Sequence, residues 1–196
     1  MSLNTLLISD EIIKERTAVH GNIDAKFIYP DIKVAQDMYI LPVLGTALYD
    51  KLQALVNQFG SATWTGNTNY QALLNTYIID ALMYFTLAEL PTTLGYQFWN
   101  KGVIRKQGEN TDLPSMSELI DISNKYRERG QWYANRLRLY LVQNAVAMFP
   151  EYLKPGNGID TINPETKGFS MPVFLGDDYG NPYCNKGGFT SKPYSE

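Results

Sequence analysis

The spacing of apolar residues between positions 115 and 148 predicts one long helix. Apolar or small residues recur there every three or four positions, which is the repeat of a single helix face. At about 1.5 Å per residue, the helix would be about 50 Å long. The small residues of this face would let another helix approach closely, although Gly130 could instead mark a break. The face consists of Leu119, Ser123, Tyr126, Gly130, Ala134, Leu137, Leu141, Ala145 and Met148.

A second long stretch, from about residue 69 to residue 101, is apolar on two sides. Because a helix that is apolar on two sides is buried on two sides, this stretch predicts the central helix of the fold. Pro91 lacks an amide hydrogen and predicts a bend. Asp80, Thr86 and Glu89 interrupt the most apolar part, which falls short of the roughly 18 apolar residues of a membrane span. We therefore expect a soluble protein.

Shorter patterns predict the remaining helices, over about residues 9–17, 24–41 and 46–59. Pro42 should end the second of these helices, and Thr46 and Gly60 should begin and end the third. The polar segments 61–69 and 102–112 predict loops, and no sustained two-residue alternation predicts a strand before residue 160. These patterns together predict an all-α protein, an antiparallel helical bundle of about four main helices with short connections.

The helical pattern stops at Lys154, and the rest of the chain is punctuated by proline and glycine but still carries many aromatic residues. A disordered tail is poor in aromatic residues, because such side chains gain much from burial. The bundle should have little spare surface for so long a segment. The chain therefore divides into a helical bundle domain, residues 1–153, and an extended C-terminal arm, residues 154–196, which we expect to dock on neighbouring subunits.

Composition agrees with one domain plus an extension, since 44% of the 196 residues are hydrophobic. A formal net charge of -3 argues against a generally basic nucleic-acid coat. Positive charge is nevertheless concentrated on the last helix, where Lys125, Arg129 and Arg136 share roughly one side. This side could contact a DNA backbone or an acidic partner, or it could simply be solvated.

The chain offers few residues for chemistry. Its one histidine, His20, and one cysteine, Cys184, cannot form a zinc cluster or an internal disulfide. No Glu-x-x-His motif and no glycine-rich phosphate loop occurs. We expect no catalytic residues, no cofactor and no metal, and synthesis in a reducing cytoplasm. An enzyme of unrecognised type would need a deep polar pocket around Asp80 or Glu89, where burial would raise the carboxyl pKa.

Three stretches carry a resemblance to a known family. They are Leu7–Ile12, Gly21–Ile32 and above all Gln36–Leu52, which has the sequence QDMYILPVLGTALYDKL. Together they resemble head-to-tail connector proteins of tailed phages that infect Bacteroidetes, crAss-like phages included. The resemblance covers the helical part well and the arm loosely, and its motif is a helix-turn-helix packing signature without catalytic chemistry.

The resemblance implies a virion structural protein of the neck, at the head-tail junction, that is made in the host cytoplasm. Such adaptors are helical subunits that form a ring, typically of twelve, below the portal protein. Genomic DNA passes through the middle without sequence-specific contacts, and other neck or tail proteins are further partners. Extended termini clasp neighbouring subunits. No membrane is involved.

Within the arm, alternate residues over 169–175 are apolar, which is compatible with a strand that has one buried side. Such a strand could add to another chain, and Pro172 would restrict it to an edge. Tyrosine is favoured in interfaces because it buries area and keeps a hydroxyl for a partner. The predicted subunit-interface residues are Phe169, Met171, Val173, Leu175, Tyr179 and Tyr183.

The main alternative is a helical regulatory or nucleic-acid-binding module. It would use the basic side of the last helix, between Arg127 and Arg138, and its arm would recognise a partner. A strongly salt-dependent affinity for DNA would favour this interpretation.

Overall fold

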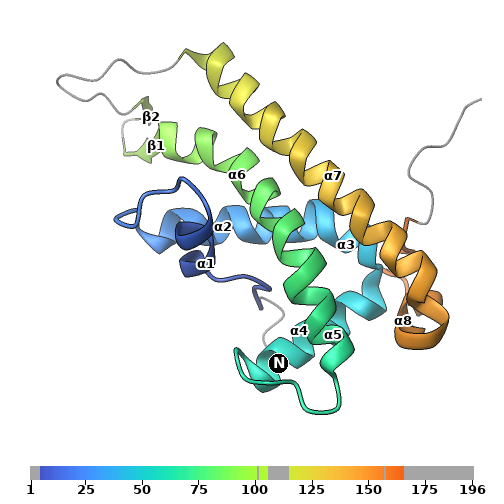
Figure 1. Ribbon diagram of the computed structural model, residues 1–196. Coiled ribbons are helices and arrows are strands. Elements are labelled where there is room, and N and C mark those ends of the chain that lie inside the picture. The colour runs from blue at the N-terminus through green and yellow to red at the C-terminus, as the bar shows by residue number, and fades with distance from the viewer. Residues whose placement is uncertain (1–4, 101, 106–114, 157, 166–196) are drawn as a thin grey trace, which may run out of the picture. The chain divides into compact units, whose positions relative to one another are not determined.

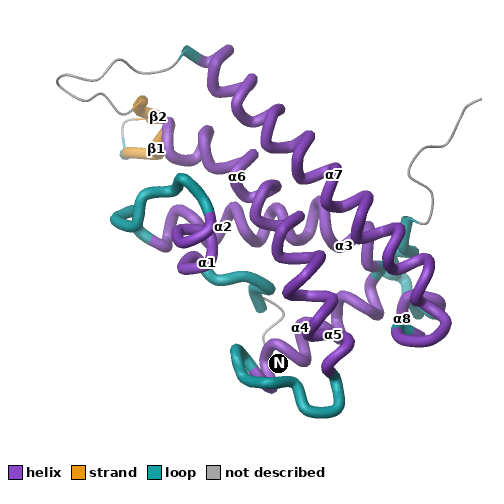
Figure 2. Tube along the Cα trace, viewed as in Figure 1, coloured by secondary structure: helices purple, strands orange, loops and turns teal. Residues whose placement is uncertain are grey.

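The computed structural model describes residues 5–100, 102–105, 115–156 and 158–165. In this part of the chain most residues are helical, and the predicted all-α helical bundle is confirmed, with one short hairpin as the exception (Figure 2). The elements are α1 (Asp10–Arg16), α2 (Ala25–Ala35), the π-helical turn η1 (Gln36–Ile40), α3 (Leu41–Leu44), α4 (Thr46–Phe59), α5 (Thr68–Leu73), the π-helical turn η2 (Leu74–Ile78), α6 (Ile79–Gly95), β1 (Tyr96–Trp99), β2 (Gly102–Arg105), α7 (Met116–Met148) and α8 (Pro150–Leu153).

The two longest helical stretches pack antiparallel. In Figure 1, α7 lies alongside the stretch formed by η2 and α6. Tyr77 stacks on Tyr140 with 4.1 Å between ring centroids, whereas Tyr84, one to two turns later in the chain, stacks on Tyr133 at 5.3 Å. Residue numbers therefore rise along one helix as they fall along the other. Because α6 also packs against α2 on another side, the predicted central helix with two buried sides is confirmed.

The buried face of α7 follows the predicted repeat. Leu119, Ser123, Ala134, Leu137, Leu141 and Ala145 are buried, and the helix runs unbroken through Gly130. A Cβ atom on Gly130 would lie 2.7 Å from Cδ1 of Phe85, so the glycine allows α6 to approach closely. Met148, predicted to belong to this face, is instead exposed. The N-terminus of α7 is fixed by a capping box in which Ser115 and Glu118 bond each other's backbone amides.

The C-terminal end of α6 differs from the prediction. The helix stops at Gly95 instead of continuing to residue 101, and Tyr96–Trp99 pairs antiparallel with Gly102–Arg105. Aromatic and β-branched residues in these two short segments favour strands. The expectation of no strand before residue 160 was therefore wrong, because four residues are too few to show a sustained alternation. Part of the predicted 102–112 loop is β2, and its residues 106–112 lie outside the described residues.

The corner between α3 and α4 also differs from the prediction. Pro42 does not end the preceding helix but lies in the first turn of α3, where its missing amide costs nothing. The stop comes at Gly45, whose φ of 75° favours glycine. Thr46 is not the cap of α4, since Gly45 takes that position without a side-chain bond. Ser9 and Asp24 cap the starts of α1 and α2, and the predicted stop at Gly60 is confirmed.

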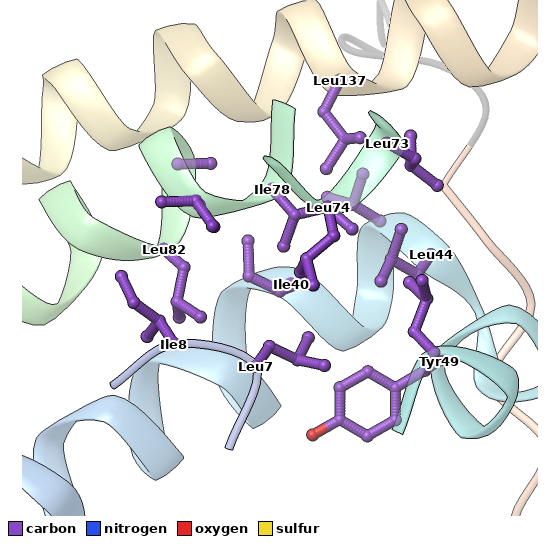
Figure 3. Packing of buried hydrophobic residues seen from close by; sticks show 14 of the residues in the cluster. Leu7, Ile8, Ile40, Leu44, Tyr49, Leu73, Leu74, Ile78, Leu82 and Leu137 are labelled. Carbon is purple, nitrogen blue, oxygen red and sulfur yellow. The ribbon is translucent and has the colours of Figure 1, made fainter. Parts of the chain in front are cut away.

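The core is formed by side chains from most of the bundle. Figure 3 shows Leu7 and Ile8 of the N-terminal segment together with labelled residues of η1, α3, α4, α5, η2, α6 and α7. Ile40, Leu44 and Ile78 are fully buried. Each such aliphatic side chain contributes about 1.5–3 kcal/mol relative to an exposed position. The short apolar segment before α1 is therefore an integral part of the core.

The continuous helical stretch Thr68–Gly95 is long and apolar enough to cross a membrane by length and composition alone, with a mean hydropathy of 1.2 in its most apolar window. Within this protein 67% of that window is buried. The central helix of a packed bundle has the same properties, so the stretch is weak evidence for a membrane span.

Residues after α8 return to the bundle at the α3–α4 corner. The amide of Thr46 donates to the carbonyl of Ile162 at 3.1 Å, the amide of Ile162 donates to Oγ1 of Thr46 at 2.8 Å, and the amide of Glu165 donates to the carbonyl of Pro42 at 3.0 Å. We call residues 158–165 the strap. The chain divides into two units at 166/167, so the start of the predicted arm belongs to the bundle, and residues 167–196 lie outside the described residues.

Candidate functional site

Three polar or apolar features of the described residues are candidates for function. The first surrounds Gln36, in the stretch that carries the connector resemblance. Its amide oxygen accepts from the amide of Leu7 at 2.9 Å, and its Nε2 donates to the carbonyl of Thr5 at 3.0 Å and to the hydroxyl of Tyr49 at 2.6 Å. The Tyr49 hydroxyl in turn donates to Asp37 at 2.7 Å. Burial raises the pKa of Tyr49, and the carboxylate of Asp37 adds to the increase.

This cluster holds structure together. Gln36 is fully buried, and its side chain makes all three bonds within the protein, so it connects η1, α4 and the N-terminal segment. A buried polar side chain with every partner satisfied fixes one arrangement of its neighbours. The resembling stretch 36–52 thus forms a packed corner.

The second feature joins η1, α6 and α7. The Tyr39 hydroxyl donates to Oε1 of Glu89 at 2.9 Å, and Arg127 donates to the same oxygen at 3.4 Å and to the Tyr39 hydroxyl at 3.3 Å. The Tyr39 ring stacks on Phe85 with 4.2 Å between centroids. Burial raises the pKa of Tyr39. Glu89 therefore accepts hydrogen bonds from residues of two other helical elements and links them.

A second carboxyl, which belongs to α2, contacts α6 one turn after Glu89, at Thr93. Asp31 of α2 is 7% exposed, accepts from Thr93 at 2.9 Å through one oxygen and has no hydrogen-bond partner for the other. Burial raises the pKa of Asp31 to about 6, against the Thr93 hydrogen bond that lowers it, and the charge of Glu89 adds to the increase. Sequence reasoning missed this residue, because an acidic residue in an amphipathic helix is usually solvated.

The third feature is the outer face of α7. Trp132, Leu139 and Val146 are 61%, 64% and 85% exposed. They recur every seven residues and therefore lie along one line of the helix, which we call the α7 stripe. Sequence reasoning followed only the buried repeat of this helix and missed the stripe, although its seven-residue spacing was visible.

A groove lies beside the stripe. It has a volume of about 440 Å³ and is lined by Trp132, Asn135, Arg136, Leu139, Tyr140 and Gln143 of α7 and by Tyr77 of η2. The guanidinium of Arg136 lies 4.8 Å from the centroid of the Tyr77 ring. The stacked tyrosines of η2 and α7 thus line this groove together with Trp132 and Leu139 of the stripe and with three polar side chains of α7.

The predicted basic residues are brought together on this side. Lys125, Arg129 and Arg136 are all exposed on α7, and Lys125 continues the seven-residue spacing of the stripe toward the helix N-terminus. Arg129 lies 5.8 Å from the centroid of the Tyr126 ring. Arg138 does not belong to this side, since it is 5% exposed and faces Glu165 of the strap at 4.0 Å.

A separate cleft of about 500 Å³ lies beneath the N-terminal segment, and its lining includes Leu6, Ile12, Val56, Trp64 and Leu74. Neither Asp80 nor Glu89 lines this cleft or the α7 groove. Among the described residues, no group of three or more His, Cys, Asp or Glu side chains could hold a metal ion. The predicted interface residues Phe169, Met171, Val173, Leu175, Tyr179 and Tyr183 lie outside the described residues.

Comparison with known proteins places the bundle in a family. A family model described as "Family of unknown function (DUF6712)" matches residues 40–162. The match begins in η1 and ends at Ile162, the strap residue that bonds Thr46. No curated protein and no solved structure matches the chain.

Proposed function

We propose that this chain, which belongs to the DUF6712 family, is a virion structural protein. It would be a head-to-tail connector adaptor that forms a ring below the portal protein and encloses the passing DNA. The role is mechanical and not enzymatic: identical subunits associate through two different surfaces, and a rotation that closes produces a ring.

The observation that carries this proposal is the α7 stripe. Large apolar side chains scattered singly over a surface need no explanation, but a line of three on one helix is typical of a protein interface. The subunit also presents a groove next to this line. A bundle that leaves its longest helix apolar on the outside is suited to association with other proteins.

The resembling stretch supports the same role. Residues 36–52 form the packed corner around Gln36 and Gly45, on which the strap rests. In this corner the polar groups bond one another and serve the fold. A ring subunit requires a rigid scaffold of this kind, because it must keep its fold while neighbouring subunits exert force on it.

Light scattering on the purified full chain, alone and with a candidate portal protein, tests the proposal. We expect a closed oligomer of defined mass, or a ring that forms only on the portal protein. A persistent monomer that does not respond to the portal protein would contradict the connector role.

A second candidate function is a nucleic-acid-binding or regulatory module. The observation in its favour is that Lys125, Arg129 and Arg136 are exposed on one side of α7. Titration of the isolated protein with duplex DNA at several salt concentrations distinguishes the two functions. A monomer whose affinity falls steeply with salt supports the module, because each phosphate contact releases counterions.

A further inference from the structure

The α7 stripe lacks a covering element among the described residues, and the sequence of the arm matches it. We propose that the stripe of one subunit binds residues 169–177 of a neighbouring copy, with this segment extended and antiparallel to α7. The inference rests on the proposed function, because it names the contact by which neighbouring subunits would hold each other.

The lengths of the two segments agree. From Val146 to Trp132, the stripe covers about 21 Å of helix axis at about 1.5 Å per residue. From Phe169 to Leu175, an extended chain covers about 20 Å at about 3.3 Å per residue. With Phe169 on Val146, the alternate residues Met171 and Val173 reach Leu139, and Leu175 reaches Trp132.

The charges agree in the same register. Asp177 continues the alternation that begins at Phe169 and would lie about 26 Å from it along an extended chain. Arg129 lies about 26 Å from Val146 along the helix axis. Asp177 would therefore face Arg129, whereas Asp178, whose side chain points to the other face of the extended segment, would only lie level with Lys125. Both basic residues are exposed, and charge pairs of this kind set the register of an interface.

The direction follows from these charges. If the segment ran parallel to α7, Asp177 and Asp178 would lie beyond Val146, at the negative end of the helix dipole. The antiparallel direction instead places Asp177 beside Arg129 and Asp178 level with Lys125. The groove beside Leu139 can then receive side chains from one edge of the segment, and its Tyr77 and Tyr140 walls offer aromatic surface to Phe169 or Met171.

An arm that binds a stripe is a contact between two different surfaces. Each subunit would donate one arm and accept another, so the contact repeats from copy to copy and can close into a ring. A symmetric contact of α7 with α7 would instead stop at a dimer and would not involve the arm.

Complementary charge reversal tests the proposal on the full chain. One variant carries Asp177→Lys and Asp178→Lys, and the other carries Lys125→Glu and Arg129→Glu. We expect each variant alone to associate about tenfold more weakly than the unchanged chain in sedimentation velocity. An equimolar mixture of the two should recover association, because an alternating ring pairs every reversed arm with a reversed stripe.

The apolar half of the contact has a matched control on the same helix. Leu139→Glu should abolish association, whereas Ile120→Glu should leave it unchanged, because Ile120 is 46% exposed but lies on another side of α7. Circular dichroism before the measurement shows that both variants fold. A synthetic peptide of residues 167–183 should compete with the association of the unchanged chain and, equally, with that of Ile120→Glu.

The outcomes separate this inference from the proposed function. An oligomer that forms normally in both charge variants and in Leu139→Glu overturns the arm-to-stripe contact and leaves the ring intact. Loss of association in Leu139→Glu, without any effect of the arm charges or the peptide, shows that another part of a second copy covers the stripe and also overturns the inference. A mixture that does not recover would mean that the arm binds its own stripe, which likewise overturns it. A chain that stays monomeric in every form, with and without a portal protein, contradicts the proposed function itself.

Discussion

The two faces of α7 carry similar apolar residues, but one face is buried in the core and the other is exposed. The inner face packs Leu137 and Leu141 against the neighbouring helices and uses Gly130 to admit the ring of Phe85. The outer face carries Trp132, Leu139 and Val146, which are also large and apolar but remain exposed. Apolar character alone therefore does not indicate which face of a helix belongs to the core. The spacing differs as well, since the inner face repeats every three or four residues and the outer face every seven.

The comparison is tested most strongly by two leucines that lie two residues apart. Leu137 is fully buried and Leu139 is 64% exposed. Leu137→Ala should lower the free energy of unfolding by about 2–5 kcal/mol, because it leaves a cavity. Leu139→Ala should change it by no more than about 0.5 kcal/mol. Urea denaturation of dilute protein measures both, and equal losses would mean that the outer face is covered within the single subunit.

Replacement of a glycine tests the close approach of α6 and α7. Gly130→Ala should lower the free energy of unfolding by about 1–3 kcal/mol, because the added Cβ would lie 2.7 Å from Phe85. Intrinsic helix propensity acts in the other direction by about 1 kcal/mol. Gly95→Ala is the control, since its Cβ would meet only Leu119 at 3.6 Å. If thermal unfolding shows Gly130→Ala to be stabilised, the two helices are not held at this distance.

Stability measured as a function of pH tests the buried carboxyl of Asp31, which lies between α2 and α6. Asp31 keeps its proton up to about pH 6 in the folded protein, whereas its ordinary pKa is 3.8. The folded state then binds more protons than the unfolded state between these values, so stability falls as pH rises from about 4 to about 6. Asp31→Asn should remove this decline and raise stability at pH 7 by about 1–2 kcal/mol, less than the whole pKa shift implies, because the amide would still be a buried polar group with one atom unpaired.

The control for this series is Asp24→Asn. Asp24 is exposed, and its hydrogen bonds to Lys26 hold its pKa below the ordinary value. This variant should keep the decline between pH 4 and pH 6. If Asp31→Asn retains the decline in urea denaturation at each pH, the buried carboxyl is not its source.

The smallest effect is expected at the edge of the outer face. Arg136→Ala removes a cation from the Tyr77 ring and should lower the free energy of unfolding by less than about 1 kcal/mol, because the arginine is exposed. Arg127→Ala offers a comparison, since it removes bonds to both Tyr39 and Glu89 and should cost more. If Arg136→Ala lowers the free energy of unfolding more than Arg127→Ala does, the side of α7 that carries Arg136 contributes more to the fold than the side that carries Arg127, which would contradict this expectation.

The sequence predicted the regular parts of the fold. The repeat of α7, its start at Ser115 and the two-sided burial of α6 follow from local patterns, because one helix face and one cap are written in neighbouring residues. The β1–β2 hairpin and the α3–α4 corner were not predicted. The two strands of the hairpin are too short to show an alternation. The corner depends on a contact from elsewhere in the chain, Pro164 against Gly45, which local propensity cannot include.

The candidate site was predicted only in part. The basic side of α7 was expected from helical spacing, and the structure brings Lys125, Arg129 and Arg136 to one exposed side. The bonds among Tyr39, Glu89 and Arg127 join residues up to 88 positions apart, and no motif records such a contact. The α7 stripe was overlooked for another reason: a leucine or valine in a helix is ordinarily assigned to the core.

The strap gives the rest of the arm a fixed origin. Its backbone is bonded to Thr46 and Pro42, and Pro164 packs against Gly45, so Glu165 is held at a defined point of the bundle. A segment tethered in this way meets a surface within its reach at an effective concentration of about millimolar. Even a low affinity of each arm for its surface would then suffice once several subunits are in place. A single free subunit would bind a second one only weakly. Any tension on the arm would be carried into the α3–α4 corner, where the fold is densely bonded.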